Sequence, residues 1–153
     1  MRKKIIFISA VIGAVFISNI SAVSAQYLDS SGGNNFINKY VSENVSNWNK
    51  SIIFVFYNDQ LCATCGKTMG MIYNIYQQYY SEIYGYFEID YANEDNYQFS
   101  IDYDLMTPLS IVLVKINDGM ARGYYKIDNP QFWAADPQFF EQQLTTKINN
   151  FFN

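Results

Sequence analysis

Two cysteines, Cys62 and Cys65, are the residues of this chain best suited to chemistry. Ala63 and Thr64 separate them, and the chain has no other cysteine and no histidine. A pair with this spacing can alternate between a dithiol and a disulfide. A helix that starts at the pair favours a thiolate at the first cysteine, because its unpaired N–H groups and its dipole present positive charge there. Only the thiolate attacks a disulfide bond, so such a placement controls reactivity.

The segments on either side of the pair predict a strand followed by a helix. Residues 51–57 are a continuous apolar, β-branched and aromatic run, typical of a strand covered on both faces. Apolar residues then recur every three or four positions, the period of an amphipathic helix. This stripe contains Cys65, Met69, Ile72, Tyr76, Tyr79 and Ile83. It predicts that Cys65 faces the core while Cys62 lies at the exposed tip, and that Gly85 ends the helix.

The remaining pattern predicts one further helix before this unit and a mixture of strands and helices after it. Residues 36–48 carry an amphipathic stripe, and residues 86–91 alternate as a half-buried strand does. Residues 93–104 predict a short helix and a loop. A hairpin is expected from residues 109–116 and 120–127, because Asn-Asp-Gly lies between them.

The final helix has clear start signals. Asp136 is suited to cap its N-terminus, and Pro137 fits the first helical position. Its expected apolar face contains Phe140, Leu144, Ile148 and Phe151 or Phe152. The predicted order is therefore α β α β (α) β β α, without repeats or a second domain.

The first 25 residues have the pattern of a secretory signal. Three basic residues at positions 2–4 precede an apolar run over residues 5–20, and residues 23–25 suit a cleavage site. We expect cleavage after residue 25, a flexible polar leader at residues 26–35 and one domain at residues 36–153. The alternative is an uncleaved membrane anchor, although the apolar run is short for a span of about 20 residues.

The charge of the chain argues against a nucleic-acid partner. There are 10 Lys and Arg against 14 Asp and Glu, a net charge of −4. Removal of three basic residues with the signal leaves 7 against 14, or −7. Nucleic-acid phosphates require basic contacts, which such a chain supplies poorly. We expect an exported monomer, periplasmic or extracellular and bacterial, with no stable membrane insertion after cleavage.

Two other uses of the cysteine pair remain open. A structural disulfide closing only two intervening residues removes little unfolded-state entropy, and a domain of this size can build a core without it. Alternatively, two thiolates bind soft metal or metalloid ions such as Cu(I). A closed zinc site would need carboxylates or another chain to complete its four ligands.

The element order, the C-x-x-C motif and Thr107-Pro108 together resemble the thioredoxin-like superfamily over roughly residues 36–152. That family has a cis-proline that opens the strand before the final hairpin and lies beside the C-x-x-C motif. Pro108 follows Cys62 by 46 positions, close to the family spacing. The resemblance implies an α/β thioredoxin fold, with a central mixed four-stranded sheet flanked by helices. The alternative is an ordinary trans proline at the start of a strand.

The resemblance also implies a thiol-disulfide oxidoreductase. Cys62 would be the nucleophile and Cys65 the resolving cysteine, with Ala63 and Thr64 in the active-site loop. Backbone groups of Thr107 and Pro108 would bind the substrate. No cofactor or metal is implied beyond the redox-active disulfide. Partners would be exported protein thiols or disulfides and, where electrons must be supplied, a membrane electron-transfer protein.

Two details refine this resemblance. The run from Leu61 to Cys65 and the later segment at residues 129–133 are similar to small secreted thioredoxin-like proteins annotated with arsenic-resistance genes. In contrast, Phe56 stands where family thioredoxins carry a buried acid, so water or a nearby acid such as Asp59 would have to deprotonate Cys65. The direction of electron flow and the physiological substrate are not fixed by the sequence.

Overall fold

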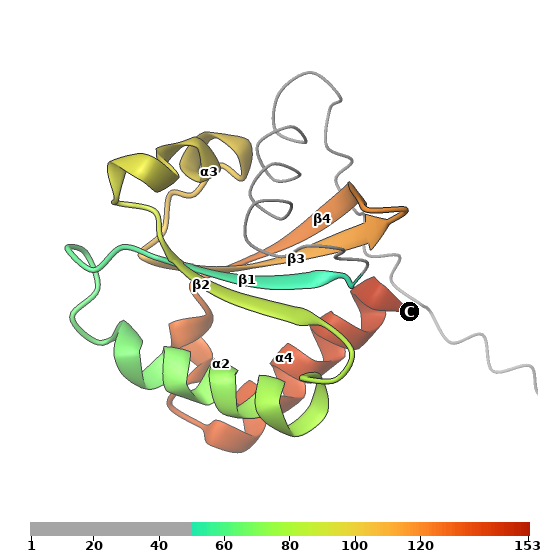
Figure 1. Ribbon diagram of the computed structural model, residues 1–153. Helices are drawn as coiled ribbons and strands as arrows, with labels where there is room; N and C mark the ends of the chain where they lie inside the picture. The colour runs from blue at the N-terminus through green and yellow to red at the C-terminus, as the bar shows by residue number, and fades with distance from the viewer. Residues whose placement is uncertain (1–49) are drawn as a thin grey trace, which may run out of the picture.

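A computed structural model describes residues 50–153, whose four strands form one sheet (Figure 1). The strand order is β2-β1-β3-β4. β1 pairs in parallel with β2, while β1 with β3 and β3 with β4 are antiparallel. The strands are β1 (Ile52–Tyr57), β2 (Gly85–Asp90), β3 (Leu109–Asn117) and β4 (Met120–Asp128). The predicted mixed four-stranded sheet is confirmed.

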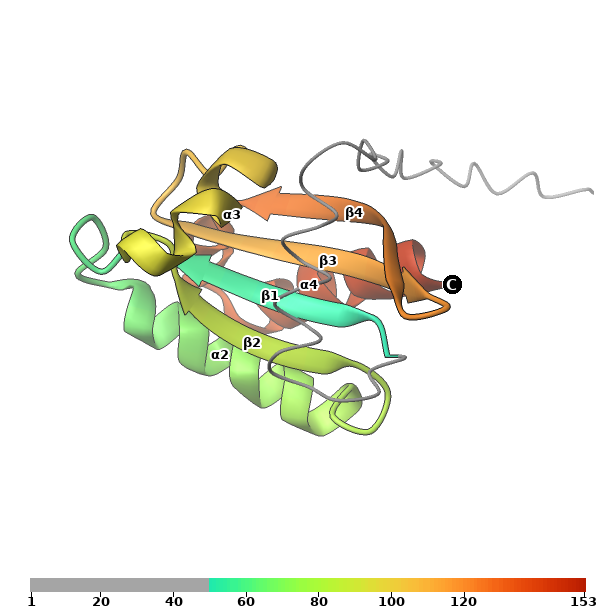
Figure 2. The same ribbon diagram turned by 45° about the horizontal axis from the view of Figure 1, so that its top comes forward.

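Helices cover both faces of this sheet (Figures 1 and 2). The two long helices, α2 (Cys65–Tyr79) and α4 (Pro137–Phe152), lie together on one face. The short helix α3 (Tyr97–Asp102) lies on the other face, as part of the helix and loop expected after the second strand. Two short 3-10 turns, η1 (Glu94–Asn96) and η2 (Pro130–Trp133), complete the described elements. The α/β class with flanking helices is therefore confirmed.

β1 has an apolar sequence throughout because both of its faces are buried. Ile53 and Val55 pack with α2 and α4, in what we call the α2–α4 core. Phe54 and Phe56 point to the opposite face and pack with Phe99 of α3, in what we call the α3 core. Alternation of polar and apolar residues is absent from the strand for this reason.

Local sequence signals predicted the hairpin and the start of the last helix correctly. Asp118 and Gly119 have φ values of 53° and 71°, so both central residues of the turn are left-handed. This is the geometry of a type I′ hairpin turn, which glycine adopts without steric cost. Asp136 accepts hydrogen bonds from the backbone N–H groups of Gln138 and Phe139, which confirms the predicted cap.

The predicted end of the second helix was wrong. α2 ends at Tyr79, and Gly85 is the first residue of β2 rather than a helix terminator. Tyr79 and Ile83 are exposed, although the predicted stripe placed them inward. The chain leaves the helix at Tyr80, whose buried ring packs in the α2–α4 core, so later positions no longer follow the helical period. The buried face of α2 consists of Cys65, Thr68, Ile72 and Ile75.

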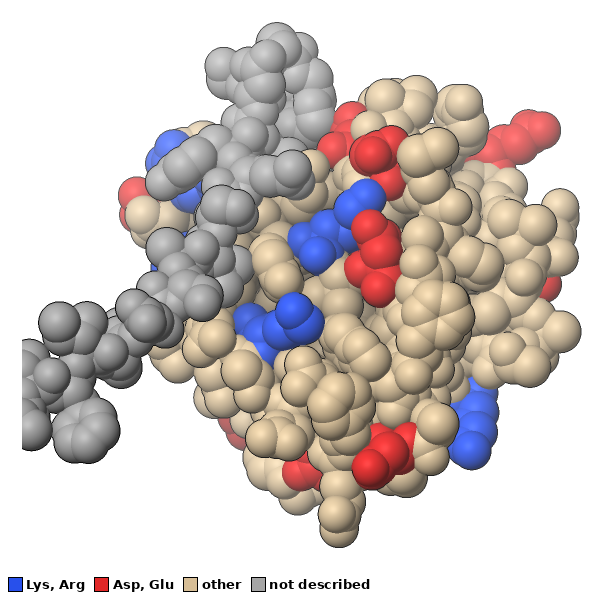
Figure 3. All heavy atoms as spheres, turned by 180° about the vertical axis from the view of Figure 1, so that it is seen from behind, with Lys and Arg blue, Asp and Glu red and all other residues tan. Residues whose placement is uncertain are grey.

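Several predictions concern residues 1–49 and lie outside the described residues: the signal, the leader and the helix at residues 36–48. None of the helices within residues 50–153 is long and apolar enough to cross a membrane. Figure 3 shows the face turned away from the viewer in Figure 1. Its charged side chains are sparse and of both signs, and most of the visible surface is uncharged.

Candidate functional site

The cysteine pair lies where β1 passes into α2, at one end of the sheet (Figures 1 and 2). Asn58 organises the connecting loop. Its side-chain Oδ1 accepts a hydrogen bond from the backbone N–H of Gln60 at 3.1 Å, and its carbonyl accepts one from that of Leu61 at 3.2 Å. Such local bonds are typical of asparagine in turns. They set the path by which the chain reaches Cys62.

Cys62 and Cys65 form a disulfide with a Cα–Cα distance of 5.3 Å. The two sulfurs are in different surroundings. Cys65 is the first residue of α2 and is only 3% exposed, packed in the α2–α4 core. Cys62 is half-buried, and Ala63 and Thr64 between the cysteines are exposed. The unequal exposure gives an external thiol or thiolate access to Cys62 and much less access to Cys65.

The start of α2 favours negative charge near Cys62. Thr64 occupies the cap position but makes no side-chain capping bond, and no acidic residue lies in the first turn. The first turn also contains Lys67, which is exposed. The backbone N–H groups of the first helical turn and the helix dipole favour a thiolate over a thiol.

The tertiary structure brings Thr107 and Pro108 beside the pair. The backbone N–H of Asn58 donates to the carbonyl oxygen of Pro108 at 3.0 Å. The same oxygen lies 4.0 Å from the sulfur of Cys65. Two segments that are more than 40 residues apart in sequence therefore meet at the disulfide.

The expected cis-proline was wrong. None of the peptide bonds within residues 50–153 is cis, so the Thr107–Pro108 bond is trans. The trans isomer of an X–Pro bond is favoured by about 0.5–1 kcal/mol. Proline is also acceptable in trans at the start of a strand, where its missing N–H removes no ladder bond. The proximity of Pro108 to the disulfide does not require the cis isomer.

Sequence reasoning missed Tyr91. This residue directly follows β2, and its hydroxyl donates to the carbonyl oxygen of Thr107 at 2.9 Å. Burial raises the pKa of Tyr91, although a side-chain hydrogen bond with Asn58 lowers it in part. The hydroxyl therefore stays protonated at neutral pH and serves as a donor. No local pattern marks Tyr91, because its role depends on a loop that comes 16 residues later.

The position six residues before Cys62 does not face the disulfide. Phe56 is fully buried in the α3 core, with ring centroids 5.1 Å from Phe99 and 5.5 Å from Tyr103. Cys65 belongs to the core on the opposite face of the sheet. Asp59 is exposed in the loop.

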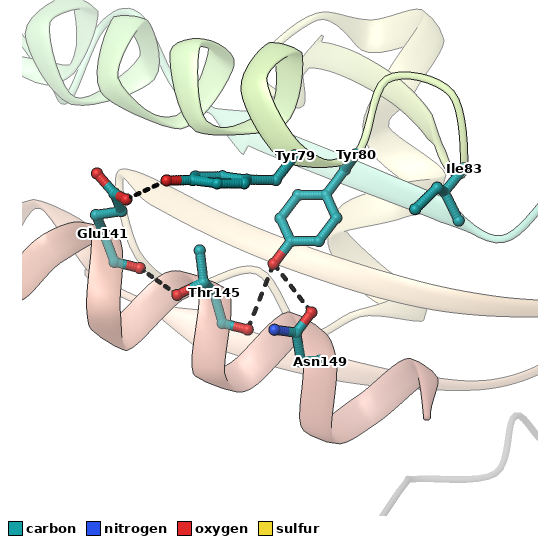
Figure 4. A pocket seen from close by; sticks show the side chains of 6 residues that line it. All are labelled: Tyr79, Tyr80, Ile83, Glu141, Thr145 and Asn149. Atoms are coloured by element: carbon teal, nitrogen blue, oxygen red, sulfur yellow. Dashed lines mark hydrogen bonds between the residues drawn. The ribbon is translucent and has the colours of Figure 1, made fainter.

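A hollow lies at the other end of α2, between that helix and α4 (Figure 4). It has a volume of about 470 Å³ and is lined by Tyr79, Tyr80, Ile83, Glu141, Thr145 and Asn149. Its polar groups bond to each other: Tyr79 donates to Glu141 at 2.6 Å, and Tyr80 donates to the Asn149 side chain at 3.1 Å. The length of α2, about 22 Å for its 15 residues, separates this hollow from the disulfide. We interpret this hollow as part of the packing interface between α2 and α4.

Comparison with known proteins leaves the site to be interpreted from its own geometry. No family model, no curated protein and no solved structure matches the chain. Within residues 50–153, no group of three or more His, Cys, Asp or Glu side chains is arranged to hold a metal ion.

Proposed function

We propose that this protein is an exported thiol-disulfide oxidoreductase with a thioredoxin fold, acting through Cys62 and Cys65. The observation that carries the proposal is the disulfide itself, with one half-buried and one buried cysteine at the start of a helix. A structural disulfide needs no such asymmetry. A redox centre requires it, because the substrate attacks one sulfur while the other acts as the internal leaving group.

In the oxidising direction, a substrate thiolate attacks the sulfur of Cys62. The new intermolecular S–S bond forms as the Cys62–Cys65 bond breaks, and Cys65 leaves as a thiolate that takes up a proton. A second substrate thiolate then attacks the substrate sulfur of the mixed disulfide and expels Cys62. The substrate dithiol is oxidised by two electrons and the protein disulfide is reduced by two.

The reducing direction reverses these steps. Cys62 attacks the substrate disulfide, and Cys65 resolves the mixed disulfide. The reduction potential relative to the partner sets the direction, and related pairs span about 150 mV.

Protein substrates fit the surface around the disulfide. Leu61, Met106 and Phe132 are 65%, 81% and 77% exposed, and they lie on three segments that meet at this end of the sheet. Exposed apolar side chains that gather in one patch are typical of surfaces that bind other chains. The backbone of Thr107 would pair with an extended substrate segment, a form of strand addition, whereas the Pro108 carbonyl accepts from Asn58 and faces Cys65. The Thr107 carbonyl already accepts one hydrogen bond from Tyr91, so its second lone pair and its N–H group would serve the substrate.

The proposal is tested by equilibrating the purified protein in glutathione buffers of graded potential. Free thiols are trapped with a maleimide, and the oxidised fraction is measured by mass spectrometry. A reversible two-electron couple supports the proposal. A potential of about −120 to −200 mV groups the protein with disulfide oxidases and isomerases, and one of about −270 mV with reductants.

Two other outcomes would contradict the proposal. A pair that never cycles in the accessible range indicates a structural disulfide. Stoichiometric Cu(I) or another soft ion retained by the reduced pair after purification, with slow exchange with glutathione, indicates a soft-metal module. The Cys62→Ser and Cys65→Ser variants are the controls, because each removes the couple and leaves one thiol.

A further inference from the structure

The backbone around Pro108 is fixed by neighbours on both sides. Tyr91 binds the Thr107 carbonyl oxygen, and the Asn58 N–H binds the Pro108 carbonyl oxygen. These bonds orient the two carbonyls, provided that the backbone of residues 107–108 is itself held in place. They leave open what fixes the Thr107 side chain and the segment that precedes it.

A chain of hydroxyl groups fixes the Thr107 side chain. Ser110 donates from Oγ to Oδ1 of Asp128 at 2.7 Å. Since the only hydroxyl proton of Ser110 is used there, its Oγ can only accept from Thr107 Oγ1, which lies 2.8 Å away. Thr107 Oγ1 also lies 3.0 Å from the Leu109 carbonyl and 3.3 Å from Asp128 Oδ1. Ser110 is fully buried, so loss of either partner would remove one of the two hydrogen bonds that satisfy its hydroxyl.

Lys126 ties the preceding segment to the same carboxylate. Its Nζ donates to the carbonyl oxygen of Asp104 at 2.6 Å and lies 3.3 Å from Oδ2 of Asp128. Asp104 has a φ of 49°, an uncommon conformation for a residue with a side chain. The segment from Asp104 to Pro108 is therefore anchored to β4 at two points. Lys126 binds it at Asp104, and Asp128 contacts it at Thr107.

The anchored segment ends against the buried sulfur. The Pro108 carbonyl oxygen is 4.0 Å from Cys65 Sγ. In the disulfide this sulfur carries no hydrogen, so the contact is not a hydrogen bond. Reduction by glutathione breaks the Cys62–Cys65 bond: two glutathione thiols become one glutathione disulfide, and two electrons and two protons pass to the cysteines. One proton gives Cys65 an S–H group, a weak donor that faces the carbonyl.

We propose that Ser110 and Asp128 are positioning residues of this redox centre, which hold the Pro108 carbonyl as a hydrogen-bond acceptor for the reduced form of Cys65. The inference rests on the proposed function for its biological meaning. Its physical content is that the Ser110–Asp128 pair stabilises the reduced protein more than the oxidised protein. Neither residue touches the substrate or exchanges electrons.

The test compares Ser110→Ala with Ser100→Ala, a control that removes a hydroxyl which donates to the carbonyl of Tyr97 on α3. Purified protein is equilibrated with glutathione, and the equilibrium constant for reduction is measured. Loss of one net hydrogen bond in the reduced state should lower this constant about three- to tenfold for Ser110→Ala. A tenfold change corresponds to a potential about 30 mV more negative. The control should leave the constant unchanged.

Two substitutions of Asp128 separate the effect of its hydrogen bond from the effect of its charge. Asp128→Asn keeps an oxygen that accepts from Ser110 but weakens the ion pair with Lys126, so the constant should stay close to that of the unaltered protein. Asp128→Ala should lower it as Ser110→Ala does. Rescue by asparagine is a result that general loss of stability does not produce.

A second measurement decides the inference without any exchange with glutathione. Each variant is unfolded with guanidinium in the oxidised form and after reduction with a phosphine. Positioning predicts a larger loss of stability in the reduced form. Equal losses in both forms would overturn the inference and leave the proposed function intact. If the unaltered pair fails to cycle with glutathione while the reduced form still loses more stability, the proposed function fails and the inference holds. If Ser110→Ala does not fold, Thr107→Val removes a hydroxyl from the same chain and gives the same comparison.

Discussion

The sulfur of Cys65 lies 4.0 Å from the carbonyl oxygen of Pro108, a residue 43 positions further along the chain. The sheet creates this proximity, because β1 leads into the disulfide loop and β3 begins at the neighbouring position in the antiparallel pairing of Tyr57 with Leu109. The carbonyl is a polar group that faces the buried sulfur from another segment. Substitutions around Pro108 can therefore alter the surroundings of the sulfur without changing either cysteine.

The single-cysteine variants should behave differently with glutathione disulfide. Cys65→Ser leaves the more accessible thiol at Cys62 and should form a mixed disulfide that persists, because no resolving thiol remains. Cys62→Ser leaves the buried thiol of Cys65 and should react at least about tenfold more slowly. Mass spectrometry over time measures both reactions. Equal rates would mean that burial of Cys65 does not govern access.

Phe56 should contribute to stability but not to redox behaviour. Phe56→Ala removes a fully buried ring from the α3 core and should lower the free energy of unfolding by about 3–5 kcal/mol. The reduction potential should not change, because the ring faces away from Cys65. Phe139→Ala, at an exposed position of α4, is the matched control and should cost about 0.5 kcal/mol or less. A shifted potential in Phe56→Ala would show coupling across the sheet.

Met106 should matter for protein substrates and not for glutathione. Met106→Asp places a charge on the apolar surface beside Thr107 and should lower kcat/KM for a reduced, unfolded protein substrate by about fivefold. Exchange with glutathione, which is too small to cover that surface, should be unaffected. Met120→Asp, at the first residue of β4 and beside the far end of β3, controls for the added charge. A similar loss in both variants would exclude a docking role for Met106.

Stability should fall at alkaline pH because buried tyrosines resist ionisation. Burial raises the pKa of Tyr80 to about 12, against an ordinary value of 10.0. Above pH 10 the unfolded chain releases a proton that the folded protein keeps, so this contribution is complete below pH 10 and is lost as the pH rises through about 12. Guanidinium unfolding from pH 9 to 12 should show this decline, with a smaller slope in Tyr80→Phe. An unchanged slope would mean that other groups cause it.

Much of the fold was predictable because its signals are local. The apolar run of β1, the left-handed turn at Asp118 and Gly119, and the Asp136 cap each depend on a few neighbouring residues. The end of α2 was not predictable in this way. Tyr79 continues the helical period in sequence, but it lies outside the core because packing against α4 is taken over by Tyr80.

The candidate site was likewise predictable only where its signals are local. The sequence by itself determined the cysteine pair, its place between a strand and a helix, and the inward position of Cys65, because spacing and periodicity are properties of adjacent residues. Only the tertiary structure decided that the Thr107–Pro108 bond is trans and that Tyr91, Ser110 and Asp128 hold that segment. Hydrogen bonds between distant segments leave no periodic trace in a single sequence, since their partners become neighbours only when the sheet has formed.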